Sequence, residues 1–185
     1  MCSSDLEVLL MYRDSFGESL LPFFADEFGV AYFSRLVPYN LNDIYTYKPN
    51  YVIMERVERR ISSFAEQAAV MDLPKVETSL EDSRIVFDKS WEDLLSQKTQ
   101  SYEGTKVNVK QDGAYYQIQG TIDKKQMTNN TKIYITFVTK NDKITYETFW
   151  ISKQEEKGVN DNGFAAYFQS DRIPDDLVDL QIIVK

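Results

Sequence analysis

A serine on a predicted strand-to-helix turn is the feature of this sequence best suited to chemistry. Ser15 lies in the segment Arg-Asp-Ser-Phe-Gly at residues 13–17, after an apolar run and before a helical pattern. Open α/β sheets bind ligands beyond the carboxyl ends of their strands, and free N–H groups at a helix start can hold an oxyanion. Ser15 is therefore a candidate nucleophile. Gly17, which lets the backbone approach a reacting group, is a candidate oxyanion contact. The alternative is that Asp14 or Ser15 only caps the helix.

A second polar segment follows the third predicted strand. Residues 55–60 read Glu-Arg-Val-Glu-Arg-Arg, and their start is expected at the same sheet edge as Ser15. Arg56 is a candidate contact to an acyl or sugar oxygen. The alternative is a solvated helix start that carries Glu and Arg pairs.

The residue counts restrict the chemistry of this chain. It contains no histidine and a single cysteine, Cys2. The chain alone can therefore build neither a Ser-His-Asp triad nor a zinc site of histidine and cysteine ligands. We predict no metal site and no cofactor, and Ser15 has no histidine base within this sequence.

The elements that must position Ser15 alternate between strand and helix. The predicted strands cover residues 6–11, 30–37 and 51–54, and the helical patterns cover residues 20–28, 41–48 and 55–69. This alternation predicts a partial three-stranded parallel α/β domain over residues 1–74. Such a thin sheet leaves an open edge. We expect either residues missing before Met1 or packing against the later domain or a partner chain, including a homo-oligomer.

From Gly104 onward, the spacing of apolar residues changes from the helical pattern to the alternation that is typical of strands. Residues 75–103 are predicted to be a linker with a short helix at 90–97, and residues 104–185 an antiparallel β-sandwich. The predicted strands cover residues 106–110, 115–122, 132–139, 144–151, 164–169 and 180–184, with turns at 112–113 and 160–163 and a bulge at Gly120. The fold class is thus α/β followed by all-β.

Aromatic residues make up 14% of the chain, which favours strands, half-buried surfaces and sugar stacking. Tyr116, Tyr134 and Trp150 are the candidate glycan-stacking residues. The alternative is that they form core contacts and cross-strand pairs.

The net charge and the apolar runs argue against several partners. A formal charge of −8 disfavours nucleic acid and anionic membranes, which bind basic patches. No apolar run approaches the ~20 residues of a membrane span, and the sequence has no signal peptide.

Two segments, LLMYRDSFGESLLPFFADEF at residues 9–28 and YKPNYVIMERVERRI at residues 47–61, resemble a known family. They are similar to the C-terminal part of the DHHW and alginate O-acetyltransferase-like family, within the SGNH hydrolase superfamily. The resemblance implies an SGNH-like α/β domain in which Ser15 carries an acetyl group to a polysaccharide hydroxyl. It also implies an extracytoplasmic or cell-surface location and a β-domain similar to a carbohydrate-binding module.

The family draws its aspartate and histidine from a motif that precedes the serine. No such motif precedes Ser15 in this sequence, so the chain by itself is predicted to be inactive. Two functions are therefore expected. The first is the C-terminal portion of a polysaccharide O-acetyltransferase or esterase-like protein, with a polysaccharide or acetyl ester as substrate. The second is a non-catalytic cell-surface module that binds a glycan or a protein.

Overall fold

The computed structural model describes residues 7–77, 80–96, 98–155 and 158–185, and of residues 153–155 and 158–161 only the backbone. The chain divides into two compact units. Unit 1 comprises Met1–Phe64 and Ala69–Met71, and unit 2 comprises Ala65–Ala68 and Asp72–Lys185.

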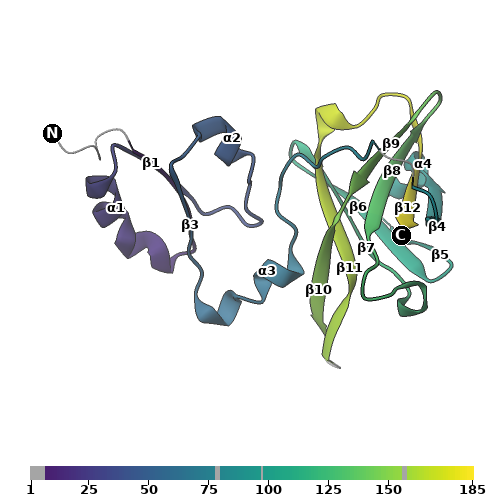
Figure 1. Ribbon diagram of the computed structural model, residues 1–185, viewed down its shortest axis with the longest axis horizontal. Coiled ribbons are helices and arrows are strands. Elements are labelled where there is room, and N and C mark those ends of the chain that lie inside the picture. Colours follow the sequence, from purple (N-terminus) through teal and green to yellow (C-terminus); the bar gives the residue numbers. More distant parts are fainter. Residues whose placement is uncertain (1–6, 78–79, 97, 156–157) are drawn as a thin grey trace. The chain divides into compact units, whose positions relative to one another are not determined.

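Unit 1 is built on a parallel sheet of three strands, as the alternation of elements predicts. The strands are β1 (Val8–Tyr12), β2 (Val30–Ser34) and β3 (Tyr51–Met54), in the order β2-β1-β3. Figure 1 labels β1 and β3. The side chains of residues 9–12 in β1 are fully buried. Burial on both faces explains why this strand is a continuous apolar run rather than an alternating one. β1 is therefore the central strand, and its carboxyl end leads directly into the segment that carries Ser15.

The helices of unit 1 are short. They are the 3-10 helix η2 (Phe16–Leu20), α1 (Leu21–Glu27), α2 (Asp43–Tyr47) and the 3-10 helix η3 (Glu58–Arg60), and the residues of α3 (Ser63–Glu66) are divided between the two units. The predicted helix over residues 55–69 is wrong, because η3 and α3 are separate and residues 55–57 are not helical. Among the helices of the described residues, none has the length and apolar character needed to cross a membrane.

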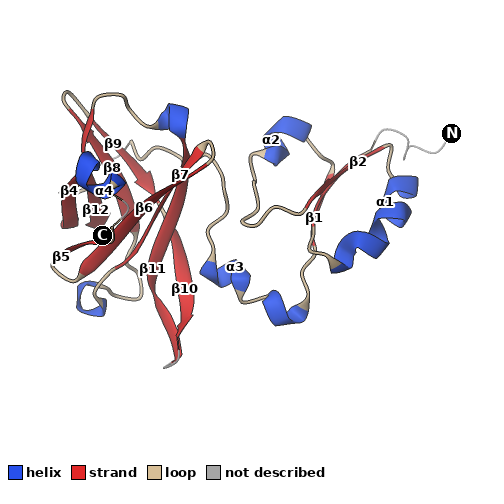
Figure 2. Cartoon of the chain, turned by 180° about the vertical axis from the view of Figure 1, so that it is seen from behind, coloured by secondary structure: helices blue, strands red, loops and turns tan. Residues whose placement is uncertain are grey.

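Unit 2 is a β-sandwich of two antiparallel sheets (Figure 2). The strands are β4 (Arg84–Ser90), β5 (Gln100–Tyr102), β6 (Thr105–Asp112), β7 (Tyr115–Thr121), β8 (Ile133–Thr139), β9 (Lys143–Glu147), β10 (Phe149–Glu155), β11 (Gly158–Gln169) and β12 (Leu177–Val184). One sheet has the order β10-β11-β7-β6-β5 and the other β4-β12-β8-β9. Buried residues from both sheets, such as Ile118, Phe164, Phe137 and Ile182, form one core. Short helices α4 (Trp91–Leu95), η4 (Lys124–Gln126) and η5 (Ser170–Arg172) join the strands.

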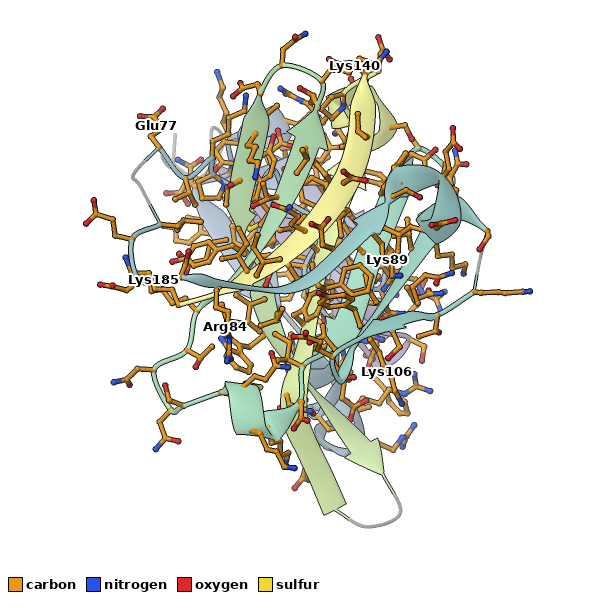
Figure 3. All side chains as sticks on the ribbon, turned by 90° about the vertical axis from the view of Figure 1, so that its right-hand side faces the viewer. Glu77, Arg84, Lys89, Lys106, Lys140 and Lys185 are labelled. Carbon is orange, nitrogen blue, oxygen red and sulfur yellow. The ribbon has the colours of Figure 1, made fainter. Side chains whose placement is uncertain are left out.

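Within the predicted linker over residues 75–103, the expected short helix at 90–97 is present as α4, whereas residues 84–90 and 100–102 form the strands β4 and β5. β4 pairs with β12, and Figure 3 looks onto this sheet, with Arg84 and Lys89 near the two ends of β4. The register shifts between Ile182 and Ile183 of β12, and on β4 both Val86 and Phe87 are buried. Two adjacent buried residues break the alternation by which a strand is recognised.

Three local predictions for the sandwich also fail. The predicted strand at 144–151 is two strands, β9 and β10, which belong to different sheets and separate at the buried Thr148. The backbone N–H of Thr148 donates to the carbonyl of Ile133 over 2.9 Å, which fixes the crossing point. The predicted turn at residues 160–163 lies inside β11. Gly120 lies in the regular β6–β7–β11 ladders and not at a bulge.

Gly120 has a packing reason to be glycine. A Cβ at this position would collide with the backbone oxygen of Lys106 and lie 2.7 Å from Cζ of Phe164. Phe164 is fully buried in the core. The absence of a side chain therefore allows the aromatic ring to lie flush against β7.

Candidate functional site

Ser15 lies where the sequence places it, directly after the central strand of the parallel sheet. It is the N-cap residue of η2, with φ −67° and ψ −20°, and its side chain is exposed. Its hydroxyl makes no capping hydrogen bond. The simple capping role is taken instead by Asp14, whose Oδ1 accepts a 2.8 Å hydrogen bond from the N–H of Phe16. The Ser15 hydroxyl is thus presented to solvent at the ligand-binding edge of the sheet.

Asp14 fixes the turn from two sides. While Oδ1 accepts from Phe16, Oδ2 accepts a 3.0 Å hydrogen bond from the N–H of Val57, in the chain that follows β3. The hydrogen bond from Val57 is the largest cause of a lowered pKa of the Asp14 carboxyl, and the charge of Arg56 lowers it further. Val57 has an extended backbone, with φ −64° and ψ 143°, and is the N-cap residue of η3, so the helical backbone begins only at Glu58.

Glu55 is a second carboxylate at the turn, and the sequence patterns do not single it out. Its Oε2 accepts a 3.0 Å hydrogen bond from the N–H of Asp14. The same oxygen lies 2.8 Å from the position that a Cβ on Gly17 would take. Gly17 is buried and therefore serves first to admit this carboxylate. The one available signal was position, since Glu55 follows β3 immediately, at the same edge as Ser15.

Two arginines balance these carboxylates. Arg13 is 6% exposed, and its Nη1 donates to the carbonyl of Asp14 over 3.1 Å and pairs with Oε2 of Glu18 at 2.7 Å. Arg56, a predicted contact residue, has its guanidinium carbon 4.8 Å from the ring centre of Tyr39 and 5.7 Å from that of Phe64. The half-buried Arg56 is therefore not part of a solvated helix start. Ser15, Gly17 and Arg56 are brought to one edge, together with Asp14 and Glu55.

The site presents a hydroxyl but holds no strong proton acceptor. The chain has no histidine, and within the described ranges no group of three or more potential metal ligands comes together. Asp14 and Glu55 both already accept backbone N–H groups. What the arrangement offers is an exposed serine hydroxyl on a turn that is held by Asp14 and Glu55.

The three candidate stacking residues do not form one platform. Tyr134 is 5% exposed and lies in β8, so the prediction that it stacks on a glycan is wrong. Its strand belongs to the four-stranded sheet, whereas Tyr116 and Trp150 belong to the five-stranded sheet. Tyr116 is half-buried against the core and meets the ring of Trp91 edge-on at 5.5 Å. Trp150 alone of the three is well exposed, at 41%.

No family model, curated protein or solved structure matches this chain. The resemblance of residues 9–28 and 47–61 to the DHHW and alginate O-acetyltransferase-like family therefore stays a prediction.

Proposed function

We propose that unit 1 is the nucleophile-bearing part of an SGNH-type O-acyltransferase or esterase that acts on a cell-surface polysaccharide. The observation that carries this proposal is the exposed Ser15 hydroxyl, unused in capping, directly after the central strand of a parallel sheet. Ligands of open α/β sheets bind at this edge. The family resemblance supplies the reaction class, acyl transfer through an acyl-serine intermediate, and the extracytoplasmic location.

In the proposed reaction, Oγ of Ser15 attacks the carbonyl carbon of an acetyl ester and loses its proton to a base. The alcohol of the ester takes up a proton and leaves, which gives acetyl-serine. A sugar hydroxyl, or water in an esterase, then attacks the acetyl-serine and releases Ser15. The N–H groups of Ser15 and Gly17 are the candidate donors to the oxyanion, since the N–H of Phe16 is already bound to Asp14.

Arg56 would contact an acyl or sugar oxygen from the same edge. Its packing over Tyr39 and Phe64 fixes the position of the guanidinium. The base must be supplied by residues outside this sequence, because a serine hydroxyl without a base is a weak nucleophile.

The test compares the chain alone with a protein that also carries an upstream segment containing the D-x-H motif of the family. The chain alone should not release acetate from an acetyl ester, and the longer protein should. Ser15→Ala in the longer protein should reduce the rate by roughly a thousandfold or more, as removal of a nucleophile does.

Ser19→Ala is the matched control, because Ser19 is an exposed serine in the same short helix. Its hydroxyl only donates to the carbonyl of Phe16, so the rate should be unchanged. If Ser15→Ala keeps full activity, or if both serine variants lose activity equally, Ser15 is not the nucleophile.

A further inference from the structure

Unit 2 contains a pocket at the edge of its sandwich, far along the chain from Ser15. The pocket has a volume of about 590 Å³ and is lined by Lys124, Met127, Thr128, Asn129, Trp150, Ser152 and Asn162. Its base comes from β10 and β11, and its wall comes from η4 and the segment that leads to β8. The volume is in the range of pockets that bind small molecules.

Trp150 gives this pocket an aromatic surface. In the β10–β11 ladder Trp150 pairs with Phe164, and Phe164 is fully buried in the core. Directly paired residues share a face of the sheet. Trp150 therefore lies on the core-facing side of the sheet, at the edge strand β10. Ser152, which lies at the register shift of β10 between Ile151 and Lys153, also lines the pocket.

The wall of the pocket is held in place before any ligand binds. Asp123 caps η4 through its Oδ1, which accepts from the N–H of Lys125 over 3.0 Å. The N–H of Thr128 donates to Oγ1 of Thr131 over 2.7 Å. A wall that is already ordered loses little conformational entropy when a ligand binds.

Asn162 connects the β10–β11 side of the pocket to the segment that leads into η4. Its backbone oxygen accepts from the N–H of Ile122 over 2.9 Å, and its Nδ2 donates to the carbonyl of Ile122 over 2.5 Å. The side chain is 9% exposed, and its Oδ1 is buried with no hydrogen-bond partner among the described residues. A buried acceptor without a donor is uncommon in proteins and leaves this residue with capacity for another hydrogen bond.

We propose that this pocket binds a saccharide, with one apolar sugar face on the indole of Trp150. The hydroxyl and amide groups of Thr128, Asn129 and Ser152 would bind the sugar hydroxyls. A ligand that is apolar throughout does not fit, because only Trp150 and Met127 among the described lining residues are apolar. The acidic net charge disfavours nucleic acid. This site is independent of Ser15 and of any acyl transfer.

The two tryptophans make the test direct. Trp150 is exposed and Trp91 is 9% exposed in the core, so a ligand at the pocket should change the emission of Trp150 only. The full chain is titrated with soluble oligosaccharides of β-1,4-glucan, of chitin and of a polyuronate, up to about 10 mM. We expect a saturable change with at least one probe and no change in the Trp150→Ala variant.

Calorimetry of the probe that binds then measures the contribution of each residue. Trp150→Ala should weaken binding about tenfold or more, and Trp150→Phe should retain most of it, because phenylalanine keeps an aromatic face. Tyr102→Ala removes an aromatic side chain of equal exposure, 40%, from the opposite edge of the same sheet and should bind normally. Ser15→Ala should also bind normally.

Three results would overturn the proposal. They are the absence of binding by every oligosaccharide, equal binding by the wild type and Trp150→Ala, and a response of Trp150 to a strand-forming peptide but to none of the sugars. The last result would make the rim a peptide groove along β10. The unfolding transition of Trp150→Ala, followed by Trp91 fluorescence, shows that the variant is folded.

Discussion

Tyr12 holds the end of β1, two residues before the Asp14–Ser15 turn. Its side chain is fully buried, and its hydroxyl donates a 2.6 Å hydrogen bond to the carbonyl of Asn40. Burial, and then the negative charge of Asp43, raises the pKa of this phenol to about 12. Tyr12→Phe removes this short hydrogen bond and leaves the half-buried carbonyl of Asn40 with only the 3.2 Å hydrogen bond from the N–H of Asp43. We expect the free energy of unfolding to fall by about 1–2 kcal/mol at neutral pH.

The same phenol makes this loss depend on pH. Tyrosine ionises near pH ~10 in an unfolded chain, whereas Tyr12 ionises near 12 in the folded protein. The folded state holds the proton more tightly, so the contribution is complete below about pH 10 and is lost as the pH rises toward 12. Such a difference in pKa is worth at most about 2.7 kcal/mol, and about 1–2 kcal/mol after solvent screening.

Two measurements check this prediction. Urea unfolding followed by circular dichroism should show a difference between wild type and Tyr12→Phe that shrinks from pH 7 to about pH 11. The difference in tyrosinate absorbance between the two proteins isolates one phenol, which should titrate near pH 12. Tyr102→Phe, which removes an exposed hydroxyl, should leave the free energy of unfolding unchanged. A Tyr12 phenol that titrates near pH ~10, or an unfolding difference independent of pH, would refute the reasoning.

Gly120→Ala should lower the free energy of unfolding of unit 2 by about 3 kcal/mol or more, because the methyl group would collide with β6 and the ring of Phe164. Both tryptophans lie in unit 2 and report this transition, and an unchanged midpoint would contradict the packing. Gly17→Ala should cost about 1–3 kcal/mol, measured by circular dichroism, since its methyl would lie 2.8 Å from Oε2 of Glu55. Asp14→Asn should remove stability that is present above about pH 4 and lost as the pH falls through the lowered pKa of the carboxyl, so the two proteins should converge in acid.

The sequence predicts the elements that depend on local patterns. The fully buried β1 is recognisable because a strand covered on both faces is apolar throughout, and β8 because Ile133, Ile135 and Phe137 alternate. Ser15 is predictable for the same reason: its place follows from the end of one element and the start of the next. These inferences need no knowledge of distant residues.

The errors arise where distant contacts override local patterns. Val57 donates to Asp14, 43 residues away, and Glu55 accepts from the N–H of Asp14, so residues 55–57 contact a distant turn where the local pattern predicts a helix. On β4, the register shift of β12 hides the alternation that would identify the strand. Tyr134 is typical of a half-exposed strand residue, yet it is buried in the sandwich. None of these partners can be identified from the residues near each position.

The position of Ser15 and its reactivity depend on different groups. The position is set by Asp14, Glu55 and Gly17, all within this chain. The hydrogen bonds through which Asp14 holds the turn also lower the pKa of its carboxyl group. A carboxylate with a low pKa is a poor acceptor for the proton of a serine. The residues that hold Ser15 in place are therefore unsuited to activate it. In the proposed reaction, a general base of higher pKa would have to reach the same sheet edge before the hydroxyl could react.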